Sequence, residues 1–427
     1  SELAMAEGQE YCKKLAVLAR KLDPDKAVTM GVNLMLCSMS AKGGGIYGNK
    51  KNGKENQNGS QTMDNVPTSA FFNMLMNLAG GMIEKMAAKP AADDATKVSF
   101  SYLDIGGYNY AASRYEKDGT LHPDRVIVGS ETLPKNLYHN WQLVKKFPYV
   151  IGDFMWTGWD YLGEAGIGTV RYKSFKNPGQ DAPIISAGCG VIDICGKPRP
   201  EVQWNRLIWG LDHTPGIGVE PYTHAGETGS ESMWRDTDAV ASWSWAGCEG
   251  KKTKVTVYSD GETAELIVNG HSYGRKKTKE YKAVFKRVVY EPGTITAISY
   301  DGEGKEQSRT SMKTAAGPAE LRVVADRSTL QAKTQDLAYI SIDLTGADGI
   351  TKSSEDTAVT VEVDGAGTLL ALGSARPNMG ENFFSDTHTT YYGKALAVVR
   401  GSDTPGKITV TVKAKGLPAK TLELDVI

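Results

Sequence analysis

The sequence lacks an excess of charge of either sign and lacks long apolar runs. Its 427 residues carry 49 Lys and Arg against 50 Asp and Glu, a formal net charge of −1 with neutral histidines. This balance argues against a polycation built to bind nucleic acid. The most apolar helix-length stretch, residues 71–83, is interrupted by Asn73 and Asn77. A membrane span needs about 20 apolar residues, so we expect neither a nucleic-acid nor a membrane partner.

Cysteine and histidine are scarce and scattered. The five cysteines show no paired CxxC spacing, and the six histidines make no HExxH or HxH pattern, which argues against a zinc site. Cys189 and Cys195 allow either a disulfide across a turn or two free thiols. The GxGxxG match at residues 43–48 has no helix after it, and no GxxxxGK[ST] occurs. We therefore expect no metal and no cofactor.

The first half of the chain alternates strands and helices. A helix is predicted over residues 2–22, where apolar side chains recur at helical spacing before Asp23-Pro24. Further helices are predicted at about 67–88, 134–146 and 200–211. Short strands, apolar on both faces, are predicted at 27–33, 98–110, 126–128 and 149–156. Strands of this kind, joined through helices, indicate a parallel sheet covered by helices.

Four strands make only half of a barrel. The chain opens on a helix with no strand before it, and an open half-barrel would expose two strand edges and an apolar interior. We therefore expect residues 1–213 to be the C-terminal half of a (β/α)8 TIM barrel, whose N-terminal half lies upstream or on another chain. In such barrels the functional groups gather at the C-terminal strand ends. The polar stretch 40–62 is predicted to be a mobile loop, with an active-site lid as the alternative.

The pattern changes to short strands and tight turns after about residue 213. Strands such as 254–258 and 264–268 are separated by Ser-Asp-Gly, Asn-Gly and Glu-Pro-Gly turns. The same style resumes after Gly317-Pro318. The spacing predicts two β-sandwich domains, 214–315 and 316–427, so the fold class is multidomain α/β plus all-β. Trp243 and Trp245 share one side of a strand, which suits core packing or, less often, a sugar platform.

Glu131 is the principal candidate for catalysis. It lies one step beyond the buried strand 126–128, before a helix that begins at Pro134. A glutamate at a strand end is ordinarily a helix cap or a solvated side chain. Its neighbours favour a functional role here, because the next strand end, residues 152–164, interleaves aromatic side chains with carboxylates. Indole faces stack on sugar rings and carboxylates bind hydroxyls, so Trp156, Trp159 and Asp160 suggest a carbohydrate site.

The motifs resemble those of glycoside hydrolase family 2, particularly its bacterial β-galactosidase branch. Four segments follow one another as do the ends of the sixth, seventh and eighth barrel strands in that family: residues 104–110, 114–116, 129–132 and 152–164. The similarity continues through residues 257–270, 336–340 and 390–400, which look like accessory β-domains. The last of these domains would be immunoglobulin-like.

The resemblance implies roles for individual residues. Glu131 matches the nucleophile, Tyr110 the tyrosine that orients it, and Trp156 the sugar-stacking tryptophan. Asn109 and Asp160 become candidate ligands of sugar hydroxyls, with Trp159 beside them. The family's acid/base glutamate follows Gly-Asn before the helix that occupies residues 2–22, and no Gly-Asn-Glu occurs in this sequence. The chain alone is therefore expected to be inactive.

The resemblance favours an exo-acting retaining β-glycosidase, a β-galactosidase acting on terminal β-galactosides. A β-glucuronidase of the same family is the nearest alternative. A noncatalytic carbohydrate-binding or structural module is the alternative from another class. Bacterial enzymes of this kind are often exported, which favours a periplasmic or extracellular location over the cytoplasm, and a homo-oligomer is compatible with the sequence.

Overall fold

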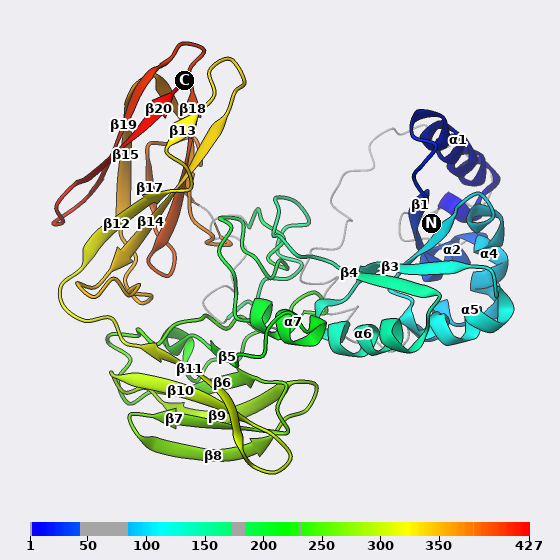
Figure 1. Cartoon of the computed structure of the whole chain (residues 1–427), viewed down its shortest axis with the longest axis horizontal. Coiled ribbons are helices and arrows are strands. Elements are labelled where there is room, and N and C mark those ends of the chain that lie inside the picture. The colour runs from blue at the N-terminus through cyan, green and yellow to red at the C-terminus, as the bar shows by residue number, and fades with distance from the viewer. Residues whose placement is uncertain (1, 43–83, 173–183, 231, 379) are drawn as a thin grey trace, which may run out of the picture. The chain divides into compact units, whose positions relative to one another are not determined.

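The computed structural model describes residues 2–42, 84–172, 184–230, 232–378 and 380–427. The chain folds as two compact units, one of Ser1–Gly158 with Glu231–Asp236 and one of Trp159–Ser230 with Thr237–Ile427 (Figure 1). The predicted domain boundaries near residues 213 and 315 both lie inside the second unit. The predicted loop 40–62, the glycine motif 43–48 and the predicted helix 67–88 lie largely outside the described residues.

The first unit contains a parallel sheet, as the strand pattern predicts. Its four strands pair in chain order, β1 (Thr29–Asn33), β2 (Ile105–Asn109), β3 (Val126–Thr132) and β4 (Val150–Met155). Helices connect the strands: α2 (Leu34–Ala41), α4 (Pro90–Phe100), η3 (Ala112–Arg114), α5 (Tyr115–Leu121), η4 (Pro134–Asn136) and α6 (Leu137–Lys146). Because the strands are parallel, their C-terminal ends lie at one edge of the sheet.

The predicted strand over residues 98–110 is wrong in its first part. Residues up to Phe100 belong to α4, which begins with Pro90 at its first position. Ala95, Ser99 and Phe100 are buried, whereas Val98 is exposed. Burial spaced four and five residues apart is that of a helix, so a short apolar run here covers the sheet instead of joining it.

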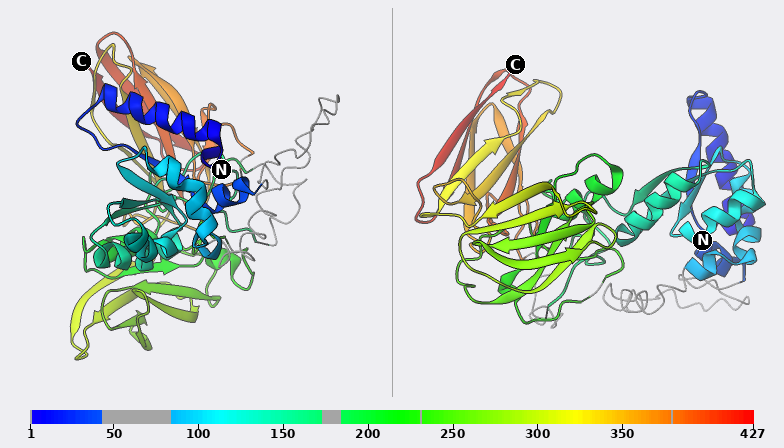
Figure 2. Two further views of the ribbon diagram at one scale, coloured as in Figure 1. Left: turned by 90° about the vertical axis from the view of Figure 1, so that its right-hand side faces the viewer. Right: turned by 60° about the horizontal axis from the view of Figure 1, so that its bottom comes forward.

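Helix α1 (Ala6–Leu22), preceded by η1 (Glu2–Ala4), carries an exposed apolar stripe. Tyr11, Leu15, Leu18 and Leu22 are 49–76% exposed and recur at spacings of four, three and four residues. Figure 2 shows α1, in dark blue, from two further directions. An adjacent side of α1 is buried at Cys12 and Ala16. The helix thus has two apolar faces, of which one is covered within the described residues.

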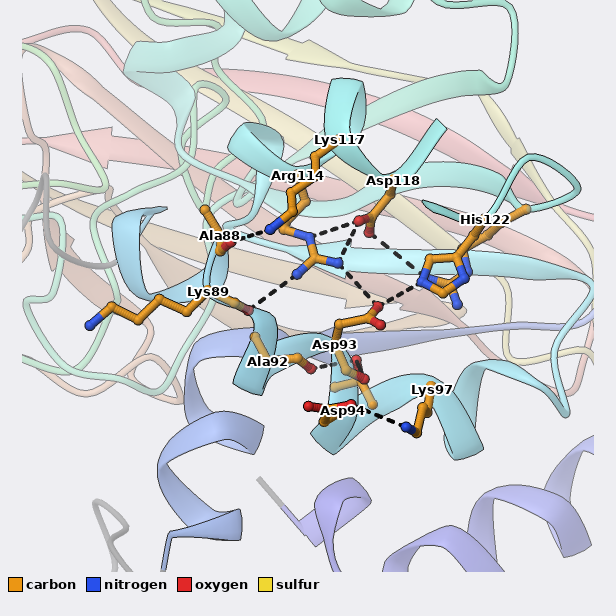
Figure 3. A network of polar contacts seen from close by, with 12 residues as sticks. Ala88, Lys89, Ala92, Asp93, Asp94, Lys97, Arg114, Lys117, Asp118 and His122 are labelled. Carbon is orange, nitrogen blue, oxygen red and sulfur yellow. Dashed lines mark hydrogen bonds and ion pairs between the residues drawn. The ribbon is translucent and has the colours of Figure 1, made fainter. Parts of the chain in front are cut away.

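A fully buried arginine joins the helices to the sheet. Arg114 Nε donates a hydrogen bond to Asp118 Oδ1 at 2.9 Å, and its Nη2 contacts both Asp118 and Asp93, the latter at 3.1 Å (Figure 3). The second oxygen of Asp118 accepts a hydrogen bond from the Tyr108 hydroxyl at 2.5 Å. His122 Nε2 lies 2.7 Å from Asp93. The network therefore links α4, α5 and β2.

A second buried carboxyl lies between β3, β4 and α6. Asp153 Oδ2 accepts a hydrogen bond from Thr132 Oγ1 at 3.0 Å, while its Oδ1 is buried with no hydrogen-bond partner among the described residues. Burial raises the pKa of Asp153 to about 7, although hydrogen bonds from Thr132 and Asn140 oppose the shift. Asp153 is therefore a carboxyl that binds its proton near neutral pH.

In the second unit, α7 (Glu201–Trp209) precedes a β-sandwich. One sheet has the order β5 (Gly216–Val219), β6 (Lys252–Tyr258) and β9 (Lys282–Val289). The other has β11 (Glu306–Lys313), β10 (Thr294–Tyr300), β7 (Thr263–Val268) and β8 (His271–Lys277). Trp243 and Trp245 are almost fully buried in the core between these sheets, beside η6 (Tyr222–His224), which confirms core packing.

A further sandwich follows in the same unit. Its first sheet orders β12 (Glu320–Ala325), β14 (Leu337–Thr345), β18 (Lys394–Gly401) and β16 (Gly367–Gly373). Its second sheet orders β13 (Thr329–Leu330), β20 (Lys420–Val426), β19 (Gly406–Ala414), β15 (Ala358–Gly365) and β17 (Thr387–Thr389). Burial alternates strictly along β18, as expected for a strand with one face on a core. Cys189 and Cys195 are both free thiols, so no disulfide joins them. Among the described residues, no helix is long and apolar enough to span a membrane.

We predict that Arg114→Met lowers the stability of the first unit by about 3–5 kcal/mol, because it removes the nearer cation of the buried Asp118 carboxylate and leaves only Arg125, 3.8 Å away. Arg20→Met is the matched control. It breaks the exposed pair between Arg20 and Asp104, 2.8 Å apart, and should cost less than about 1 kcal/mol. Urea unfolding followed by amide hydrogen exchange in β2 and β3 measures both. Equal effects of the two substitutions would contradict a structural role for the buried pair.

We also predict that the stability of the first unit falls as the pH rises toward 7. The folded-state pKa of Asp153, about 7, lies above the value of about 3.9 for an unfolded chain, so the folded state binds the proton more tightly. The contribution is complete below about pH 4 and is lost by up to about 1.4 kcal/mol per pH unit as the pH rises through the folded pKa. Asp153→Asn should flatten this part of a stability curve measured by urea unfolding at several pH values. An unchanged curve would show that another group carries the proton.

Candidate active site

Glu131 lies at the C-terminal end of β3, as expected for a catalytic group on a parallel sheet. Its carboxylate accepts a hydrogen bond at Oε2 from Asn109 Nδ2, at 3.0 Å. Asn109 is the last residue of the neighbouring strand β2. Both side chains are half-buried. A carboxylate that accepts an amide donor and stays accessible can contact a ligand.

A slip in the pairing of β2 with β3 brings these side chains together. Tyr108 pairs with Gly129, but Asn109 pairs with Glu131, so Ser130 is an extra residue on β3. Successive side chains of a regular strand point to opposite faces. The extra residue cancels this alternation, because Ser130 Oγ donates a hydrogen bond to Asn109 Oδ1 at 2.7 Å while Glu131 accepts one from the same amide. Such bulges re-aim side chains next to active sites.

Tyr110 follows directly and is held in an unusual conformation. Its φ of 52° lies in the left-handed region, which costs a residue with a side chain of this size free energy. The Tyr110 backbone N–H donates to the Glu131 carbonyl at 2.7 Å, and its hydroxyl accepts a hydrogen bond from Trp234 Nε1 at 3.1 Å. The two rings meet edge to face, with centroids 6.4 Å apart. Tyr110 is thus anchored at both its backbone and its hydroxyl.

The other predicted ligand residues divide between the two units. Trp156 belongs to the first unit, where its backbone N–H donates to the Thr132 carbonyl at 2.8 Å, one residue beyond Glu131. Asp160 and Trp159 belong to the second unit. Asp160 is buried, lies 3.5 Å from Arg199 Nη2 and accepts the Gly188 backbone N–H at 2.9 Å. Trp159 is 57% exposed.

One cluster of potential metal ligands occurs among the described residues, and a cation already occupies it. Ligand atoms of Asp93, Asp118 and His122 lie within 4.8 Å of one another. The guanidinium of Arg114 contacts both carboxylates (Figure 3). Burial raises the pKa of Asp93, but the hydrogen bond and charge of His122 and the charges of Arg114 and Arg125 outweigh it and lower that pKa below its usual value. The arrangement suits a structural ion pair better than a bound metal.

Two residues of the site carried no sequence signal for the roles they take. The place of Ser130 in the structure depends on the register slip between β2 and β3, which no local motif indicates. Trp234 lies 124 residues from Tyr110 in the chain, and no local motif links them. By contrast, the sequence does indicate Glu131, Asn109 and Tyr110, because they lie at the predicted ends of two strands. Only pairing of the strands reveals that Asn109 faces the carboxylate.

Comparisons with family models match two parts of the second unit. Residues 321–423 match the glycoside hydrolase family 2 C-terminal domain 5. Residues 250–308 match a domain of unknown function, DUF4982. The first match covers most of the second sandwich, and the other lies within the first sandwich.

Two curated proteins resemble the chain. A β-galactosidase, BoGH2A, from Bacteroides ovatus is 25% identical over 435 residues, which cover 100% of this chain and 45% of that protein. A putative β-glucuronidase from Formosa agariphila is 23% identical over 282 residues, 64% of this chain and 24% of that protein. The chain therefore spans less than half the length of these relatives.

Solved structures of glycosyl hydrolases also resemble the chain. A glycosyl hydrolase family 2 member from Bacteroides cellulosilyticus superimposes with a TM-score of 0.75 at 29% identity, covering 100% of this chain and 48% of the other. A second such structure, from strain DSM 14838 of that organism, gives a TM-score of 0.71 at 28% identity, covering 99% of this chain and 47% of the other. Together with the C-terminal domain match, these relatives show that the chain is similar to a C-terminal portion of glycoside hydrolase family 2 members.

Proposed function

We propose that the chain is part of an exo-acting retaining β-glycosidase, a β-galactosidase in which Glu131 is the nucleophile. The observation that carries this proposal is the half-buried Glu131 carboxylate at a parallel strand end, with Asn109 donating to it at 3.0 Å and Tyr110 beside it. The similarity to the Bacteroides ovatus β-galactosidase over the full chain supports the substrate class. The general activity of the relatives is β-glycoside hydrolysis, and the galactoside preference is the finer part of the proposal.

The mechanism needs two carboxyl groups about 5–5.5 Å apart. Glu131 would attack the anomeric carbon as the leaving oxygen is protonated, which forms a glycosyl-enzyme ester and releases the aglycone. Water would then hydrolyse the ester with inversion at the same carbon, so the product retains its configuration. Since the sequence contains no Gly-Asn-Glu, we assign the acid/base carboxyl to a segment other than the chain described here, which alone would be inactive.

The remaining site residues receive roles in binding. Trp156 would stack on the sugar ring, and Tyr110, anchored by Trp234, would hold the nucleophile in position. Asn109 has an amide between Ser130 and Glu131, which suits a group that contacts both the carboxylate and a sugar hydroxyl. Asp160 and Trp159 are assigned to substrate binding on the resemblance, although Asp160 already pairs with Arg199.

The parallel sheet would be the C-terminal half of a (β/α)8 barrel. Within the described residues β1 is an edge strand, and α1 exposes the stripe Tyr11, Leu15, Leu18 and Leu22. Unpaired edges and exposed apolar stripes are costly unless another segment covers them. We assign the covering segment to the N-terminal half of the barrel, and we take the two sandwiches to be immunoglobulin-like accessory domains. An extracellular or periplasmic location and a homo-oligomer stay proposals from the resemblance.

A β-glucuronidase is the second candidate. The similarity to the putative β-glucuronidase of Formosa agariphila favours it, but that match covers 64% of this chain against 100% for the β-galactosidase. A glucuronide would need basic groups for its carboxylate, and no Asn-x-Lys follows Glu131 in the sequence. A noncatalytic carbohydrate-binding module would need no nucleophile at all.

We predict that Glu131→Gln lowers kcat for an aryl β-galactoside by at least about 10³-fold in the longer protein that carries both barrel halves, because the amide cannot form the ester. Glu116→Gln, which changes an exposed glutamate paired with Lys146, should leave kcat unchanged. A slow fluorinated galactoside should label Glu131, as read by peptide mass spectrometry. Faster hydrolysis of the aryl β-glucuronide would select the second candidate, and full hydrolytic activity of Glu131→Gln would contradict the nucleophile assignment. Carbohydrate binding without hydrolysis of either substrate, unchanged in Glu131→Gln, would favour the noncatalytic module.

The barrel proposal has its own prediction. Leu15→Lys with Leu18→Lys should weaken association of this chain with a separately expressed N-terminal half by at least about 10-fold, because charge replaces the apolar stripe of α1. Lys13→Gln on the same helix is the control and should leave association unchanged. Sedimentation of the mixed halves measures both. If the double variant binds as tightly as the original chain, α1 does not face the other half.

A further inference from the structure

Ser130 is the extra residue in the slip between β2 and β3, and the catalytic scheme leaves it without a role. It lies directly before Glu131, and its side chain is half-buried. A bulge residue with no function would be free to point its side chain into solvent. Ser130 instead directs its hydroxyl to the Asn109 amide oxygen, 2.7 Å away.

The hydroxyl is a second contact that holds the Asn109 amide in one of its two orientations. An asparagine amide has a donor end and an acceptor end, and rotation by half a turn exchanges them. With Ser130 donating to Oδ1, the Nδ2 end is directed to Glu131 Oε2 at 3.0 Å. The rotated amide would place Oδ1 against the carboxylate, where two acceptors repel. The Glu131 carboxylate, which can only accept, therefore sets the orientation of the Asn109 amide, and the Ser130 hydroxyl holds the amide in place from its other end.

Two glycines leave the space that this arrangement requires. A Cβ added at Gly107 on β2 would lie 2.9 Å from Ser130 Oγ and 2.5 Å from the Met30 carbonyl oxygen. A Cβ at Gly31 on β1 would lie 2.9 Å from Asn109 Oδ1. Side chains at these positions would displace the hydroxyl or the amide. The strands β1, β2 and β3 can therefore approach this closely because Gly31 and Gly107 have no side chain.

We propose that Ser130 is a positioning residue that acts on Glu131 through Asn109. Its hydroxyl holds the amide with Nδ2 toward the carboxylate, so that Oε2 keeps its donor and the carboxylate keeps its position. This proposal rests on the function proposed above for Glu131. It differs from a simple structural role because the effect of Ser130 must pass through a single side chain.

The kinetic test is a double-mutant cycle in the longer protein with both barrel halves. Ser130→Ala should lower kcat for an aryl β-galactoside by about 10-fold with KM changed less than about two-fold, since the nucleophile is misplaced and binding is retained. In the Asn109→Ala background, Ser130→Ala should have no further effect. Ser113→Ala, which removes an exposed hydroxyl bonded to the Glu84 carbonyl, should leave both parameters unchanged. Additive effects of Ser130→Ala and Asn109→Ala would overturn the proposal.

A second measurement is independent of activity and uses this chain itself. With 15N-labelled asparagine, the Asn109 side-chain amide signal is identified by its loss in Asn109→Ala. Ser130→Ala should shift it and speed its hydrogen exchange, whereas Ser113→Ala should not. An Asn109 signal that does not respond to Ser130→Ala overturns the proposal. If the signal responds but Glu131→Gln retains full hydrolysis, the bonded arrangement stands and the function proposed for Glu131 fails.

Discussion

The alternation of side chains along a strand is the constraint on which the candidate site depends. A regular β3 would direct Ser130 and Glu131 to opposite faces of the sheet. The slip of one residue against β2 places both beside Asn109, at the point where β2 ends. The contacts of Glu131 with the Asn109 amide and with the Tyr110 backbone lie at this added residue.

The two faces of the parallel sheet use polar groups differently. On the helix-covered face, the carboxylate of Asp118 is fully buried and satisfied by Arg114 and Tyr108, which is an arrangement that rigidifies. On the other face, Glu131 and Asn109 are half-buried and bonded to each other. The buried pair of Arg114 and Asp118 can rigidify the sheet that carries Asn109 and Glu131. A reactive group requires such a rigid support.

Much of this fold could be predicted from the sequence, because its signals are local. Strands apolar on both faces indicated a parallel sheet, and turn residues marked the sandwiches. The prediction ended β3 at Val128 because Gly-Ser-Glu-Thr is polar, yet the strand continues to Thr132 through the slip. The prediction also mistook the end of α4 for a strand, since Val98, Ser99 and Phe100 are too few to reveal a period. Contacts distant in the chain, such as Trp234 with Tyr110, have no local signal.

The six residues Glu231–Asp236 belong to the first unit, although the chain on either side of them belongs to the second. The two units are therefore interleaved along the polypeptide, and no single cut yields either one whole. A polypeptide ended at Gly158 would retain the full parallel sheet but would lose the indole that holds the Tyr110 hydroxyl. A gene fusion that joined other sandwich domains directly after Gly158 would lose the same hydrogen bond to the Tyr110 hydroxyl.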